Sequence, residues 1–141
     1  MLAYVAAALG GALGALARWG VADALPYEPG SWPGATLLVN VGGCLVLGLL
    51  IGLVFSRSPG SSWLRPFLGT GVLGGFTTYS TFAVDVVQQA TAGAWGIVTG
   101  YLLASVLGGI AAAALGVLGG RALARPRLTP TEARAAEESL G

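Results

Sequence analysis

Long apolar segments alternate with short segments that contain proline, glycine and polar residues along most of the chain. The apolar segments cover residues 2–24, 35–55, 64–87 and 94–123. About 20 helical residues, each rising about 1.5 Å, are enough to cross a hydrocarbon core of ~30 Å. The pattern therefore predicts an all-α integral membrane protein with four transmembrane helices joined by short loops.

The third apolar segment contains an interruption. Glycine pairs, β-branched residues and clustered hydroxyls are poor material for continuing a helix. They form the run Gly74-Gly75-Phe76-Thr77-Thr78-Tyr79-Ser80-Thr81-Phe82. Irregular backbone persists at membrane depth only where it is buried in protein or lines a polar cavity, because lipid cannot satisfy its N–H and C=O groups. We therefore expect a break in the third helix and a path for an ion beside it.

The sequence changes character near its C-terminal end. From residue 126 on it is rich in Arg, Pro, Glu and Ala, and nothing there buries an apolar core. We accordingly expect a membrane domain over residues 1–125 and a polar tail over residues 126–141, solvated or disordered.

The composition agrees with a membrane protein and argues against other classes. The chain is 55% hydrophobic and 9% charged, whereas a soluble domain carries about a quarter charged residues. Its net charge of +1 gives no reason to expect nucleic-acid binding. Histidine is absent, and no nucleophile with a base or cluster of metal ligands is visible, so we do not expect an enzyme.

Several neutral polar side chains fall inside the apolar segments. Asn40 lies in the second, and Tyr101 and Ser105 share one helix face in the fourth. Together with the hydroxyls of the interruption they form a track of neutral donors suited to an anion, which must bind strongly enough to enter and weakly enough to leave. The rings of the interruption add edges with partial positive charge. Interhelical bonding by Asn40 and core packing by the rings are the alternatives.

The helix break also suggests a cation site and a dimer. Unwound carbonyl oxygens can ligate a hard cation such as Na⁺, but one copy supplies too few of them. Two copies facing each other across a dimer axis would complete the shell. Four helices of this length enclose little interior, so a homodimer or a related heterodimer in the lipid membrane is expected.

Charged and small residues near these features have simpler interpretations. Arg18, beside Trp19, is either an interfacial anchor or a charge at a pore mouth. Asp23 and Asp85 lie near the ends of apolar segments, where solvation at the interface is the simplest account. Glycines four residues apart predict close helix packing in three places: Gly10 with Gly14, Gly48 with Gly52, and Gly116 with Gly120.

These residues resemble the Fluc/CrcB family of fluoride channels, which export fluoride passively from the cytoplasm. Three motifs carry the resemblance: Gly10-Gly11 through Arg18-Trp19, Gly34-Ala35-Thr36 through Asn40 and Gly43, and the interruption over 74–82. The resemblance implies an antiparallel dual-topology dimer with two fluoride pathways and a structural Na⁺ at its centre.

The resemblance also implies roles for individual residues. Carbonyls of Gly74 and Thr77 would hold the Na⁺. The fluoride pathway would comprise Asn40, Tyr79, Ser80, Thr81, Phe82, Tyr101 and Ser105. Two positions depart from the family pattern. Tyr79 stands where the first pore aromatic is usually Phe, and Gly109 stands where a further hydroxyl is expected, one turn beyond Ser105.

The arginines predict an orientation. With four spans, one side of the membrane holds all but one of them, namely Arg57, Arg65, Arg121, Arg125, Arg127 and Arg134. Basic residues favour the cytoplasmic side, so both termini are expected there, in a multi-pass protein of the cell inner (plasma) membrane. An equally inserted homodimer should lack such a bias, which favours pairing with an oppositely oriented paralogue.

Two other functions compete with a fluoride channel. A small multidrug-type, proton-coupled transporter is also a four-span dimer, but it needs a carboxylate deep in the first span, and none precedes Asp23. A non-conducting structural subunit of a membrane complex would leave Asn40 and the interrupted helix unexplained.

Overall fold

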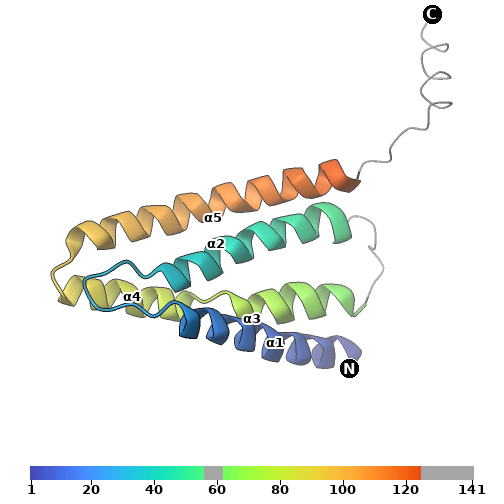
Figure 1. Ribbon diagram of the computed structural model, residues 1–141. Coiled ribbons are helices and arrows are strands. Elements are labelled where there is room, and N and C mark those ends of the chain that lie inside the picture. The colour runs from blue at the N-terminus through green and yellow to red at the C-terminus, as the bar shows by residue number, and fades with distance from the viewer. Residues whose placement is uncertain (56–61, 125–141) are drawn as a thin grey trace, which may run out of the picture.

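The computed structural model describes residues 1–55 and 62–124, and these form an elongated bundle of helices (Figure 1). The described residues contain no strand. In chain order the elements are α1 (Leu2–Ala24), α2 (Gly34–Leu49), η1 (Leu50–Phe55), η2 (Pro66–Leu73), α3 (Gly74–Phe76), α4 (Tyr79–Thr91) and α5 (Trp95–Ala124). The predicted tail at 126–141 lies outside the described residues.

Three of the helical stretches are long and apolar enough to cross a membrane. They are Leu2–Ala24, Gly34–Val54, in which α2 continues into η1, and Trp95–Ala124. Their boundaries agree closely with three of the four apolar segments. The protein is therefore an all-helical, multi-pass membrane protein. A fourth crossing, by η2, α3 and α4 together, stays a prediction.

The predicted interruption is confirmed and lies at Thr77 and Thr78. Both residues have extended backbone, with φ −76° and ψ 156° at Thr77 and φ −149° and ψ 122° at Thr78. The Thr78 side chain accepts a hydrogen bond from the Thr81 N–H at 3.1 Å, so it is the N-cap of α4. The helix restarted there continues to Thr91, beyond the apolar segment that ended at residue 87.

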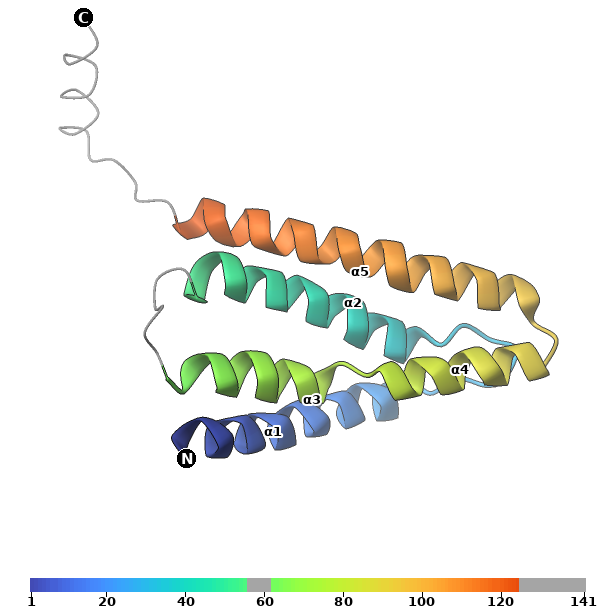
Figure 2. The same ribbon diagram turned by 180° about the vertical axis from the view of Figure 1, so that it is seen from behind.

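The bundle consists of two tightly packed helix pairs. In one pair α1 lies against η2 and α3, and in the other α2 and η1 lie along α5 (Figure 2). A Cβ on Gly14 would collide with backbone atoms of Val72 and Phe76, and one on Gly116 would collide with the backbone of Leu45. The predicted glycine pairs therefore let the helix backbones touch, as small residues do in membranes.

One glycine pair in these contacts was not predicted. Gly71 and Gly75 face Ala7, Gly10 and Gly11 of α1, and a Cβ on either would meet that backbone. Glycines of α1 and glycines of the broken segment therefore both lie at this helix contact, where each backbone touches the other.

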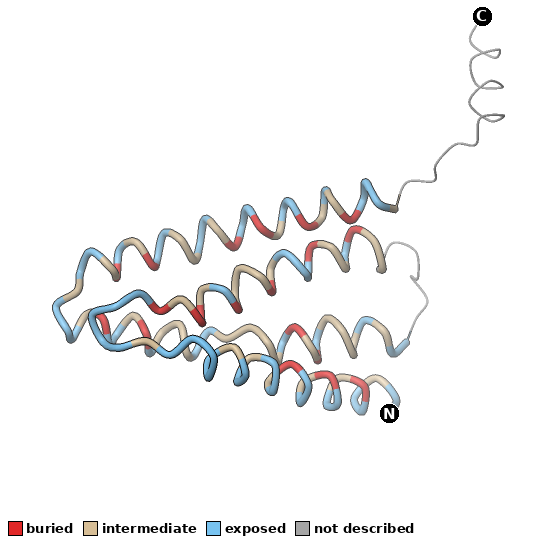
Figure 3. The backbone as a smooth tube through the Cα atoms, viewed as in Figure 1, coloured by how far each residue is buried: buried red, intermediate tan, exposed pale blue. Residues whose placement is uncertain are grey.

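Buried residues form a thin stripe along the inside of the bundle (Figure 3). The buried side chains include Val39 and Tyr101, while leucines and valines along α1 and α5 face outward. An apolar exterior over a small interior suits a protein whose solvent is lipid. Met1 and the end of α5 lie at the same end of the bundle (Figure 1), as the predicted topology requires.

Candidate functional site

Asn40 of α2 bridges to the helix break with both ends of its amide. Its Nδ2 donates to the Thr78 carbonyl at 2.9 Å, and its Oδ1 accepts from the Thr78 N–H at 2.8 Å. The Thr78 N–H is the donor that a continuous helix would send to the Gly74 carbonyl. Asn40 therefore satisfies the broken backbone, and one Nδ2 hydrogen remains for another acceptor.

The threonine hydroxyls of the break are also engaged. Thr77 Oγ1 donates to the Leu73 carbonyl at 2.8 Å, and Thr78 Oγ1 donates to Thr81 Oγ1 at 3.0 Å and lies 3.2 Å from Ser80 Oγ. These bonds hold the extended residues between α3 and α4. The threonine hydroxyls therefore stabilise the local backbone conformation.

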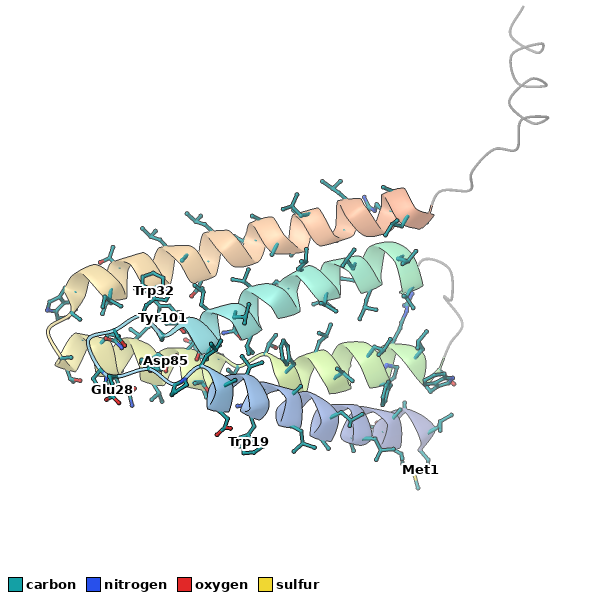
Figure 4. All side chains as sticks on the ribbon, in the orientation of Figure 1. Met1, Trp19, Glu28, Trp32, Asp85 and Tyr101 are labelled. Carbon is teal, nitrogen blue, oxygen red and sulfur yellow. The ribbon has the colours of Figure 1, made fainter. Side chains whose placement is uncertain are left out.

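Arg18 of α1 also bonds to this region. Its Nε donates to the Gly75 carbonyl at 3.1 Å, so a cation lies at the C-terminal end of α3, where helix carbonyls lack partners. Trp19, beside it in sequence, points away from the bundle (Figure 4). The guanidinium thus caps the broken helix, a role that neither sequence-based alternative included.

A cavity of about 480 Å³ opens beside the break. It is lined from α2, η2, α3, α4, α5 and the break itself, and no lining side chain carries a formal charge. Its polar members are Asn40, Cys44, Thr77, Thr78, Tyr79 and Ser105. The Ser105 hydroxyl is buried and has no hydrogen-bond partner within the described part of the chain. The arrangement can offer neutral donors to a small anion.

Aromatic rings extend from this cavity toward the α1–α2 loop. Tyr79 is 81% exposed, and its ring centroid lies 6.0 Å from that of Phe82. The Phe82 ring lies 5.2 Å from the fully buried ring of Tyr101. The three rings therefore form a continuous row.

The predicted site residues are brought together only in part. Asn40, Tyr79, Phe82 and Ser105 share the main cavity with Gly74 and Thr77. Arg18 and Thr81 line a second cavity of about 310 Å³, and Thr78 lines both cavities. Ser80 is exposed, and Tyr101 turns its hydroxyl away, toward α4.

The interpretation of Asp85 as a solvated interfacial residue was wrong. Asp85 is 2% exposed, and both of its oxygens accept hydrogen bonds, Oδ1 from the Tyr27 hydroxyl and Oδ2 from the Tyr101 hydroxyl. The α1–α2 loop folds over the end of α4 and covers the carboxylate. The spacing of Asp85, Gln88 and Gln89 on one face of α4 was the available signal.

The carbonyl groups at the break have the chemistry that a hard cation needs. Thr78 sends its N–H to Asn40 rather than to the Gly74 carbonyl, and Gly74 is exposed at the cavity with Thr77 beside it. Neutral carbonyl oxygens of this kind suit Na⁺. Two such groups from one chain remain fewer than a full ligand shell.

Comparison with known proteins identifies the family. The model of the CrcB-like protein family, described as camphor resistance (CrcB), matches residues 5–117. The chain belongs to the CrcB family. A relative from Paracoccus denitrificans, named fluoride-specific ion channel FluC, is 44% identical over 120 residues, which cover 85% of this chain and 95% of the relative.

Other CrcB relatives carry related names. The fluoride-specific ion channel FluC 2 of Nocardia farcinica is 43% identical over 112 residues, covering 79% of this chain and 80% of that protein. The fluoride-specific ion channel FluC of Chloroflexus aurantiacus is 42% identical over 118 residues, covering 83% of this chain and 94% of that protein. The resemblance seen in the sequence is confirmed, and the CrcB family is one of channels and not of enzymes.

Proposed function

We propose that this protein forms a passive, fluoride-selective channel that exports fluoride from the cytoplasm. The observation that carries the proposal is the Asn40 bridge to Thr78, which lies in the wall of an uncharged cavity at a helix break. The relatives named as fluoride-specific channels support the choice of ion.

The cavity lining suits rapid passage of an anion. A fixed Arg or Lys would hold fluoride too long, whereas hydroxyl, amide and ring-edge donors bind it more weakly. Such donors are the Ser105 hydroxyl, which has no partner among residues 1–55 and 62–124, the remaining Asn40 hydrogen, and the edges of Tyr79 and Phe82. Ser80, Thr81 and Tyr101 extend the proposed pathway on either side.

A structural Na⁺ belongs to the same proposal. The Gly74 and Thr77 carbonyls from each of two copies would hold it, and its charge would neutralise carbonyl dipoles that face each other at the dimer centre. Replacing Na⁺ by a large organic cation during purification should lower the thermal stability of the dimer, measured by the temperature at which it dissociates.

Exposed residues on either side of the break support a dimer. Gly74, whose carbonyl does not receive the Thr78 N–H, and Tyr79 and Ser80 are exposed in the single chain, and lipid offers their polar groups no partners. A second copy or a paralogue packed over this face would cover them. An antiparallel arrangement would give two fluoride pathways related by the dimer axis.

The orientation of each subunit follows from charge. Arg65 stands at the start of the broken segment and Arg121 in the last turn of α5, at the end of the bundle that holds Met1 (Figure 1). Arg57, Arg125, Arg127 and Arg134 lie outside the described residues. We place both termini in the cytoplasm, at the inner membrane. Relatives named FluC 1 and FluC 2 fit pairing with a paralogue.

A flux assay tests the function. Proteoliposomes that contain the assembled dimer should release fluoride but not chloride down their gradients. Asn40→Asp should slow fluoride release about a hundredfold, because the carboxylate cannot donate to the Thr78 carbonyl and it repels the anion. Ser62→Asp, which adds the same charge on an exposed residue, should conduct normally. Equal chloride and fluoride release would contradict the proposed selectivity.

The buried Asp85 favours one second candidate. A proton-coupled transporter of small cations needs a carboxylate that binds protons away from water, and Asp85 is buried as such a group would be. Both Asp85 oxygens are already bonded, however, and Asp85 does not line either cavity. Uptake of a cationic dye driven by a proton gradient, without fluoride flux, would favour this alternative.

A further inference from the structure

The α1–α2 loop is attached to α4 and α5 at several points. The Tyr27 hydroxyl lies 2.5 Å from Asp85 Oδ1 and 3.0 Å from Gln88 Oε1, and the Gly30 N–H donates to Gln89 Oε1 at 2.8 Å. Trp32 meets the Tyr101 ring edge-on, with centroids 6.1 Å apart. Figure 4 shows Trp32, Tyr101 and Asp85 together at this end of the bundle.

The Asp85 carboxylate is buried without a cation. No Arg side chain pairs with it in the described part of the chain, and its two oxygens are satisfied by two phenol hydroxyls instead. A buried charge is tolerated only when it is well bonded. Of the two hydrogen bonds to the Asp85 carboxylate, the α1–α2 loop therefore supplies one, through the Tyr27 hydroxyl.

The carboxylate stands close to the proposed anion path. Asp85 follows Phe82 by three residues on α4, and it bonds Tyr101, whose ring lies 5.2 Å from that of Phe82. A carboxylate that turned toward this row of rings would repel fluoride. The carboxylate would also accept hydrogen bonds from the donors that are proposed to bind fluoride.

We propose that Tyr27 is a positioning residue for conduction, which holds the Asp85 carboxylate against the loop and keeps its charge out of the fluoride path. The inference rests on the proposed function. Burial first, and then the hydrogen bond to Asp85, raise the pKa of Tyr27 well above its ordinary value. Its hydroxyl therefore remains protonated, and able to donate, throughout the neutral range.

The test is fluoride release from proteoliposomes by Tyr27→Phe, Asp85→Asn and the double variant. Tyr27→Phe keeps the ring but loses the donor, and it should slow release about tenfold, the factor that corresponds to one charge-assisted hydrogen bond. Asp85→Asn should conduct nearly as the unmodified protein does. The double variant should match Asp85→Asn, because no charge is left to be released.

A purely structural role for Tyr27 gives a different result. In that case the double variant would be as slow as Tyr27→Phe, which would overturn the proposal. Loss of conduction in Asp85→Asn, or unchanged release by Tyr27→Phe, would overturn it too. If Tyr27→Phe alone does not assemble, the double variant decides, since the proposal requires it to assemble and conduct.

Matched controls separate these outcomes from general effects. Tyr4→Phe removes the hydroxyl of an 81% exposed tyrosine, and Asp23→Asn neutralises an exposed acid at the end of α1. Both should leave release unchanged. An unmodified protein that releases no fluoride would overturn the proposed function and this inference with it, whereas a conducting protein with an unaffected Tyr27→Phe would overturn the inference alone.

Discussion

Two polar residues at the main cavity have opposite hydrogen-bonding states. Asn40 uses both ends of its amide on the Thr78 backbone, whereas the buried Ser105 hydroxyl has no partner within the described residues. An unsatisfied buried hydroxyl costs stability unless something outside the chain bonds to it. We therefore propose that Ser105 binds the fluoride ion, whereas the observed hydrogen bonds of Asn40 stabilise the break.

This assignment predicts how Ser105→Ala behaves. Thermal stability should stay equal or rise slightly, because no protein hydrogen bond is lost. Fluoride release should slow about tenfold if the hydroxyl bonds the ion. Thr99→Ala on the same helix removes an exposed hydroxyl bonded to the Trp95 carbonyl, and it should leave release unchanged. Normal release by Ser105→Ala would remove this residue from the pathway.

Residue roles could be predicted where composition conflicts with location. An amide and a hydroxyl in apolar segments stand out from their surroundings, so Asn40 and Ser105 could be named as candidates from the sequence. Asp85 was misinterpreted because it lies near the end of an apolar segment, where a side chain usually reaches water. The sequence position does not reveal that the α1–α2 loop folds back and buries this carboxylate. Tyr27 resembled any loop tyrosine, since its partner lies 58 residues away in the sequence.

At the scale of elements, glycine decides how the helices meet. The interruption over 74–82 and three glycine pairs were predictable, because local propensity and four-residue spacing are properties of the sequence itself. The helix against which each glycine pair packs was not predictable, since any glycine pair can in principle pack against any other. The structure pairs the α1 glycines with Gly71 and Gly75 of the broken segment.

This packing predicts contrasting effects for two alanine substitutions in α1. Gly14→Ala places a methyl group against the backbone of Val72, where no flexible side chain can yield, and it should cost about 1–3 kcal/mol of stability. Gly20→Ala meets nothing within 4 Å and should be neutral or stabilising. Thermal dissociation in detergent measures both, and equal behaviour of the two variants would contradict the close α1 packing.

At the scale of the whole molecule, the single chain exposes polar groups beside its helix break. Gly74, Tyr79 and Ser80 flank the break and are exposed, and lipid offers their polar groups no partners. The described arginines at the Met1 end, Arg65 and Arg121, favour one orientation of the chain. If the proposed dimer is antiparallel, its oppositely oriented subunit comes from the minority of inverted copies or from another chain.

Reporter fusions can measure this orientation. Green fluorescent protein at the C-terminus should fluoresce strongly, because it folds in the cytoplasm, and alkaline phosphatase at the same position should be nearly inactive. Replacing Arg65 and Arg121 by Gln should raise phosphatase activity at the expense of fluorescence, since it weakens the charge asymmetry that sets insertion. Asp23→Asn offers a control, because it removes an exposed acidic charge at the end of α1, and it should change neither signal. Equal signals from both reporters in the unmodified protein would instead indicate dual insertion, and a homodimer would then need no paralogue.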